Sequence, residues 1–393
     1  MTPIRLALDT VSSEELRKLC GWIASGSRLT MGPLTEQFET AFAEYLGTPN
    51  ATFVNSGSSA NLLALYALME AKGSSRKSII VPAISWATTV APAMQLGMDV
   101  SLCDCDRSNL GLDLDHFSDL CRTKAPEFAM LVHVLGHPNS MKEIHEICEK
   151  YGVTLVEDAC EALGSSYGGR KLGIHGAAGT FSFYYGHQMS TIEGGMVVVQ
   201  DRKLHNIVKS MRAHGWARDL DADVKAHWER EFSIDEFRSL YTFYYPGFNC
   251  RPTDLNACLG LTQLAQMEHV TQVRERNYLL YKAGLEKEFW VQTSEHDVLC
   301  SFAFGAVVEN RLDVFHHLRQ CGIETRPLIC GNIGRQPFWT KRYGPAELPN
   351  ADVIHEDGLY LPNHANLSPA DVNRVVHEFR KVAIPSSRLQ SHR

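Results

Sequence analysis

Short apolar runs and helix-like stretches alternate along the first two thirds of the chain, and this alternation limits the fold more than any other feature. Several runs, such as MLV at 130–132 and MVVV at 196–199, are apolar on both faces, as expected for strands covered by helices on both sides. The alternation predicts an α/β domain with a mostly parallel, seven-stranded sheet, whose ligands bind at the carboxyl ends of the strands. Strands are expected at residues 52–55, 78–81, 100–104, 128–135, 153–157, 179–184 and 195–199, with helices at 58–71, 88–97 and 141–151.

The last third of the chain has a different pattern. A polar stretch at 218–238 is followed by one long helical segment at 253–286, for which Thr253 or Asp254 is a suitable N-cap. A strand at 301–308 and a helix at 314–321 then indicate a small α+β domain. We therefore expect a large domain at 1–270, with an N-terminal arm, and a small C-terminal domain at 271–393.

Composition excludes several classes of protein. The 45 acidic and 38 basic residues give a net charge of −7, which argues against a nucleic-acid surface. No apolar run approaches the roughly 20 residues that span a bilayer, and the first residues have no apolar h-region, so no secretory signal is expected. Eleven cysteines without regular spacing are typical of reduced thiols in a cytoplasmic protein.

Two strand ends carry polar groups suited to a phosphorylated cofactor. In VNSGSSAN at 54–61, small residues lead from a strand into a helix, so Gly57 and Ser58 form a candidate anion site. The same residues are also typical of an ordinary helix N-cap. In LVEDACE at 155–161, a buried carboxylate such as Asp158 would keep a heterocyclic nitrogen protonated, as a pyridoxal ring requires. The alternative is that Asp158 and Glu161 begin a solvated loop.

A third segment, GTFSFYYGHQM at 179–189, delivers Ser182 and then His187 into a loop. In this order, the three segments resemble the phosphate loop, the Glu-Asp-Ala strand end and the lysine loop of the DegT/DnrJ/EryC1/StrS family. These are sugar-modifying enzymes with the aspartate-aminotransferase fold, type I among pyridoxal-phosphate proteins. Further matches are TMGP at 30–33, PAISW at 82–86, RAHG at 212–215 and GFNCRPTD at 247–254.

The resemblance implies roles for individual residues. Gly57, Ser58 and Ser182 would hold the cofactor phosphate, Trp86 would stack on the pyridine ring, and Asp158 would pair with the ring nitrogen.

Other implied roles concern the substrate and the partner subunit. Glu161 would lie near the oxygen substituent of the cofactor. Asn249 would reach the phosphate from the neighbouring subunit, which implies a homodimer with shared active sites. His214, Arg218 and Arg326 are candidates for contacts with the sugar, the diphosphate or the glutamate carboxylate.

The chain departs from the family at one decisive position. Most members carry lysine where this chain has His187, and no lysine occurs between Lys171 and Lys203. Imidazole cannot form the internal Schiff base, so pyridoxal or pyridoxamine phosphate would be held non-covalently. Histidine remains a competent acid and base, with a reference pKa of about 6.5.

A histidine here resembles the hexulose 3-dehydratase subgroup. One branch acts on CDP-sugars and binds an iron–sulfur cluster through a Cys-x-Cys-x7-Cys insertion, but residues 215–249 contain no cysteine. HExxH and paired CxxC spacings are also missing, so no metal site is expected. The resemblance therefore implies L-glutamate-dependent removal of the C3 hydroxyl from GDP-4-keto-6-deoxy-D-mannose, giving a 4-keto-3,6-dideoxy sugar and ammonia.

Three alternatives remain at this stage. The first is a nucleotide-sugar aminotransferase with an unusual base. The second is a non-catalytic sensor that binds pyridoxal phosphate. A hydrolase is the third, because GSSYG at 164–168 fits G-x-S-x-G, a motif that needs a strand before Ser166 and a helix after it.

Overall fold

The computed structural model describes residues 2–26, 28–73 and 77–389. Its centre is a seven-stranded sheet in the order β1-β9-β8-β5-β4-β2-β3. Strand β9 is antiparallel to β1 and β8, and the other neighbours are parallel. The predicted α/β fold is confirmed. The strands are β1 Asn50–Val54, β2 Ser78–Pro82, β3 Asp99–Cys103, β4 Phe128–Val132, β5 Thr154–Asp158, β8 Ala178–Ser182 and β9 Gly195–Val199.

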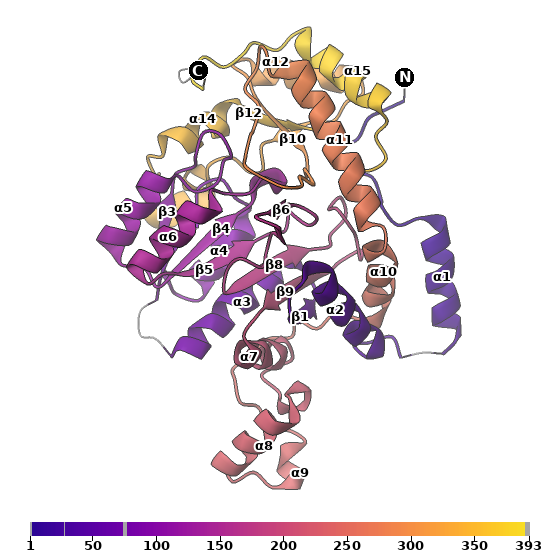
Figure 1. Cartoon of the computed structure of the whole chain (residues 1–393), viewed down its shortest axis with the longest axis vertical. Helices are drawn as coiled ribbons and strands as arrows, with labels where there is room; N and C mark the ends of the chain where they lie inside the picture. Colours follow the sequence, from indigo (N-terminus) through magenta and orange to yellow (C-terminus); the bar gives the residue numbers. More distant parts are fainter. Residues whose placement is uncertain (1, 27, 74–76, 390–393) are drawn as a thin grey trace.

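Helices cover both faces of this sheet (Figure 1), because side chains of buried strands point alternately to either side. One apolar cluster joins alternate strand residues to α3 (Gly57–Lys72), α4 (Ala87–Gln95) and α7 (Arg202–Arg212). Two further clusters on the other face include residues of α2 (Pro33–Leu46) and α10 (Asp254–Leu264), and of α5 (Leu114–Lys124) and α6 (Met141–Tyr151). The result is a three-layer α/β/α domain.

The C-terminal third of the chain forms a separate, smaller region. A three-stranded antiparallel sheet, β10-β12-β11, packs with α11, α12 and α15 around a separate apolar cluster, which also includes Ile4 of the N-terminal arm. The elements are α11 Met267–Leu285, β10 Phe304–Val307, α12 Arg311–Gln320, β11 Arg326–Pro327, α13 Pro337–Tyr343, α14 Pro349–Asp357, β12 Gly358–Leu361 and α15 Pro369–Arg380.

The remaining elements lie outside these layers. In Figure 1, α1 (Ser13–Ala24) stands beside α10, and α8 (Ala222–Glu231) and α9 (Glu236–Ser239) project from the body below α7. A hairpin of β6 (Ser166–Tyr167) and β7 (Arg170–Lys171) follows β5. Across the described residues, no helix has the length and hydropathy required to cross a bilayer.

Two elements differ from the sequence prediction. The segment 253–286 is two helices, α10 and α11, separated by a turn at Ala265 and Gln266, where the Gln266 side chain donates to Glu15 Oε1 at 3.1 Å. The strand predicted at 128–135 ends at Val132, since Leu135 adopts a left-handed backbone with φ 52°. That turn lets the Leu135 amide donate to Glu161 Oε2 at 2.8 Å.

Candidate active site

A cavity of about 620 Å³ lies at the edge of the sheet where β1, β5 and β8 end. This volume is in the range of small-molecule and cofactor sites. The cavity brings together most of the residues that the sequence singled out. Those that line it are Gly57, Ser58, Trp86, Asp158, Glu161, Ser182, His187 and Arg326.

The first turn of α3 forms one end of the cavity. Ser56 caps this helix by accepting the Ser59 amide at 3.1 Å, and Ser58 Oγ bonds Thr88 Oγ1 at 3.0 Å. A Cβ added to Gly57 would lie 2.6 Å from the Cβ of Ser182, so only glycine leaves this cradle open. The free amides of a helix N-terminus and two hydroxyls therefore converge where an anionic group can bind.

Asp158, the last residue of β5, is buried and held by three donors. Its Oδ2 accepts from Asn61 Nδ2 at 2.9 Å and from Thr89 Oγ1 at 2.8 Å, and its Oδ1 accepts the Cys160 amide at 3.1 Å. Thr180 Oγ1 in turn donates to Asn61 Oδ1 at 2.5 Å. These bonds fix the carboxylate as an acceptor at the cavity wall, where it is suited to a protonated ring nitrogen.

The adjacent carboxylate, Glu157, has a different task. Its side chain accepts the amides of Gly173, His175 and Gly176 and pairs with His133 Nε2 at 3.1 Å. Burial opposes its ionisation, but these hydrogen bonds, foremost that of His133, hold the pKa of Glu157 at about 2. Glu157 thus anchors a loop, and Asp158 faces the cavity.

Glu161 lines the cavity beyond the end of β5. Burial raises its pKa to about 7, against the opposing hydrogen bond from the Leu135 amide. The nearby charge of Asp158 adds to this rise. Near neutral pH, Glu161 therefore exists in both protonation states and is able to give or take a proton.

His187 follows β8 in a turn and contacts the ring of Phe302 at a centroid distance of 5.3 Å. Burial, together with the nearby Arg274 guanidinium, lowers its pKa to about 4. The sequence had suggested the ordinary value near 6.5. At neutral pH the imidazole is therefore uncharged, and its Nδ1 is buried with no hydrogen-bond partner among the described residues. An uncharged imidazole in the cavity lining has one unprotonated ring nitrogen, which a base requires.

Aromatic and basic side chains also line the cavity. Trp86, directly before α4, is 59% exposed and offers a flat apolar face. Arg326 lies beside Tyr360 on the neighbouring strand of the small sheet. Leu6 and Ala7 of the N-terminal arm complete the lining.

Sequence reasoning missed Asn61 and Thr89, although both bind the central carboxylate. A weak signal existed for Asn61, which is a buried amide in the otherwise largely apolar helix α3. Thr89 gives no such signal.

Three predicted residues do not line this cavity. Asn249 is exposed and accepts from Arg251 Nε at 3.1 Å. His214 is exposed on a turn with φ 69°. Arg218 pairs with Asp219 at 3.0 Å and lies over the ring of Trp216.

The G-x-S-x-G motif does not form a nucleophile elbow. Ser166 lies in the two-residue strand β6, which pairs with β7 in a hairpin, and no helix follows it. The hydrolase alternative is therefore wrong.

Comparison with known proteins agrees with the geometry. The family model of the DegT/DnrJ/EryC1/StrS aminotransferase family matches residues 11–380. The chain belongs to this family. A GDP-4-keto-6-deoxy-D-mannose 3-dehydratase from Yersinia pseudotuberculosis is 33% identical, and the match covers 91% of this chain and 93% of that protein.

Solved structures of the same kind of enzyme are also similar. The E. coli GDP-4-keto-6-deoxy-D-mannose-3-dehydratase with bound hydrated PLP superimposes with a TM-score of 0.88 at 29% identity, over 96% of this chain and 100% of that one. A GDP-4-keto-6-deoxymannose-3-dehydratase with a trapped PLP-glutamate geminal diamine gives 0.87 at 28% identity, with the same coverage.

The cavity fits pyridoxal phosphate. The Gly57 cradle suits its phosphate, the oriented carboxylate of Asp158 suits its ring nitrogen, and Trp86 offers a stacking face. No lysine is among the described residues that line the cavity, so the chain offers no amine there for covalent attachment.

Proposed function

We propose that this chain catalyses the L-glutamate-dependent 3-dehydration of GDP-4-keto-6-deoxy-D-mannose, with pyridoxal or pyridoxamine phosphate bound non-covalently. The observation that carries the proposal is the buried, uncharged His187 in a cavity that has a cofactor cradle and no lysine. In the overall reaction the sugar loses the oxygen of its C3 hydroxyl. Glutamate is oxidised to 2-oxoglutarate with release of ammonia, so atoms and electrons balance.

The chain's own groups would hold the cofactor at three points. Gly57, Ser58 and Ser182 bind its phosphate, Trp86 stacks on its ring, and Asp158 keeps its ring nitrogen protonated. When bound, the cofactor supplies an electron sink for bonds broken next to its ring. Because Asn61 and Thr89 fix the Asp158 carboxylate, the ring has one preferred orientation in the cavity.

His187 is proposed to move the proton in both directions. In its uncharged form it would act as the base that takes the proton released beside the cofactor ring. A protonated group with a pKa of about 4 is then a strong acid, so it readily gives this proton to the departing C3 hydroxyl. Glu161, with a pKa of about 7, would share proton transfer at the cofactor's oxygen substituent.

The remaining polar residues support substrate binding across a homodimer. Arg326 lines the cavity and suits the carboxylate of glutamate. Asn249, His214 and Arg218 lie outside it and would serve the site of the partner subunit. The segment that carries them also exposes large aromatic side chains, including Phe237 at 83% exposure, as interaction surfaces do.

Eleven free thiols favour a reducing compartment, and we place the enzyme in the cytoplasm.

The testing experiment incubates the protein with pyridoxal phosphate, L-glutamate and either the GDP- or the CDP-linked 4-keto-6-deoxyhexose. We expect a 3-deoxy product, 2-oxoglutarate and ammonia from the GDP-sugar. An amino sugar would favour the aminotransferase alternative. A lack of conversion of glutamate would favour the sensor.

A further inference from the structure

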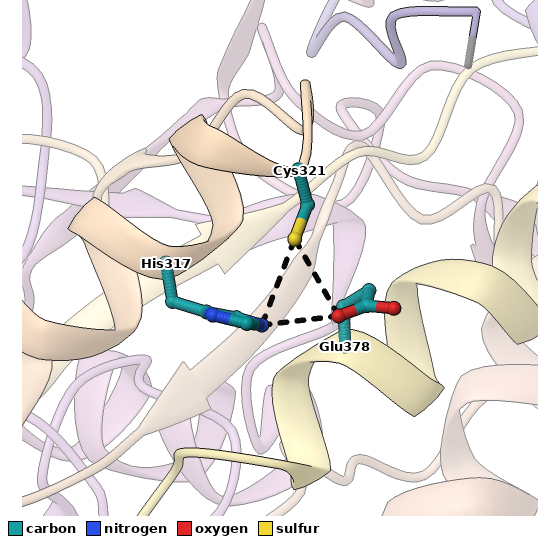
Figure 2. Close-up of side chains that lie close together, drawn as sticks. All are labelled: His317, Cys321 and Glu378. Carbon is teal, nitrogen blue, oxygen red and sulfur yellow. Dashed lines mark hydrogen bonds and ion pairs between the residues drawn. The ribbon is translucent and has the colours of Figure 1, made fainter.

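A histidine, a cysteine and a glutamate meet in the C-terminal part of the chain (Figure 2), and none of them lines the cavity. His317 and Cys321 are four residues apart on one face of α12 and its C-cap, and Glu378 comes from the last turns of α15. His317 Nε2 lies 3.0 Å from Glu378 Oε2. Cys321 Sγ lies 3.7 Å from His317 Nε2 and 3.5 Å from the same Glu378 oxygen.

These distances are close to the edges of a tetrahedron around one ion. Zinc binds nitrogen and oxygen at about 2.0–2.1 Å and thiolate sulfur at about 2.3 Å. Tetrahedral angles then place nitrogen and oxygen about 3.3 Å apart and sulfur about 3.6 Å from either. The three observed separations match this triangle without rearrangement of the helices. Without a metal ion, the three protonated side chains form hydrogen bonds with one another in the same place.

We propose that His317, Cys321 and Glu378 bind one zinc ion, with water in the fourth position. The donor set of imidazole, thiolate and carboxylate is one that zinc prefers, and its two negative charges neutralise the ion. Binding takes the thiol proton of Cys321 and leaves His317 neutral with its proton on Nδ1. One proton is therefore released for each ion bound.

Neighbouring groups orient these ligands. Lys381 Nζ holds the other carboxylate oxygen of Glu378 at 2.8 Å, so the oxygen that faces the cluster stays available. Arg374 donates to the Cys321 carbonyl at 2.5 Å and to the Thr2 carbonyl at 2.8 Å. Outer hydrogen bonds of this kind fix the geometry of metal ligands.

At this position the ion would have a structural role. It would join α12 to α15 beside the residues that anchor the N-terminal arm, where Ile4 pairs with Ile323. The same arm continues to Leu6 and Ala7, which line the active-site cavity. No metal site was expected from the sequence, because HExxH and paired CxxC spacings are missing. Glu378 is 57 residues from Cys321, so no short motif contains both.

The test uses the tag-free full chain, dialysed against a chelator and titrated anaerobically with Co²⁺ near neutral pH. We expect one Co²⁺ per chain, a near-ultraviolet band from sulfur-to-cobalt charge transfer, and loss of this band when Zn²⁺ is added. Because binding displaces the thiol proton of Cys321, uptake should increase with pH.

Two substitutions and a control make the outcome decisive. Cys321→Ser should remove the band, and His317→Gln should weaken binding by at least about tenfold. Cys20→Ser, which changes an exposed thiol, should leave the titration unchanged. Absence of the band in the parent chain, or a band that survives Cys321→Ser, would overturn the proposal. If Cys321→Ser unfolds, as judged by its thermal midpoint without metal, an unchanged titration of His317→Gln overturns it equally.

Discussion

Replacement of the carboxyl group of Glu161 by an amide should stabilise the cofactor-free protein at alkaline pH. Burial raises the pKa of Glu161 from 4.5 to about 7 in the folded chain. The folded state therefore binds this proton more tightly than the unfolded state does. Stability is fully present below pH 4.5 and is lost as pH rises through 7. Glu161→Gln keeps an acceptor for the Leu135 amide but cannot ionise.

The magnitude follows from the size of the shift. At about 1.4 kcal/mol per pKa unit, the rise corresponds to about 3 kcal/mol. Linkage places about 2.5 kcal/mol of this loss between about pH 5 and pH 8. With an unfolding entropy of about 2.1 cal/mol/K per residue, a chain of 393 residues converts that loss into about 3 °C of melting temperature.

The assay is thermal unfolding of wild type and Glu161→Gln without cofactor across this pH range. The difference in Tm, variant minus wild type, should grow by about 3 °C from the acidic to the alkaline end. Glu146→Gln, which alters an exposed carboxyl on α6, is the matched control and should track wild type. Parallel pH profiles for wild type and Glu161→Gln would refute the raised pKa.

Two further substitutions test the cofactor cradle, each measured by titration with pyridoxal phosphate. Gly57→Ala places a methyl 2.6 Å from the Ser182 Cβ, so it should abolish binding and cost about 1–3 kcal/mol of folding stability; unchanged affinity would place the phosphate elsewhere. Thr89→Val removes one hydrogen bond to the Asp158 carboxylate, worth about 1.5–3 kcal/mol for a charged acceptor, and should weaken binding about 10- to 100-fold. Equal affinity after Thr89→Val, in a protein that folds normally, would contradict the orienting role of that bond.

The sheet could be predicted because its strands are continuous apolar runs. Each of the seven predicted strands is present, with ends that differ by a few residues. Strand ends also led to Asp158 and Ser182, since the carboxyl ends of parallel strands meet at one edge. The helices α1, α2, α5 and α7 were missed, although Pro33 and the caps Ser12, Asp113 and Asp201 mark their starts.

Features that depend on tertiary packing could not be predicted from local pattern. Asn61 and Thr89 reach one carboxylate only because α3 and α4 pack side by side against the sheet. The low pKa of His187 arises from burial beside Arg274, which is 87 residues away along the chain. The cluster around Cys321 likewise needs the packing of α12 against α15.

His187 stands where most family members carry a lysine anchor, and His187→Lys tests its proposed catalytic role most directly. Wild type and variant are incubated with cofactor, L-glutamate and GDP-4-keto-6-deoxy-D-mannose, and the sugar product is identified by mass spectrometry alongside free ammonia. We predict that the variant binds the cofactor but forms no 3-deoxy sugar, because an amine at this position attaches the aldehyde covalently and replaces the neutral base. Wild-type rates of 3-deoxygenation by His187→Lys would contradict the proposed role of the histidine.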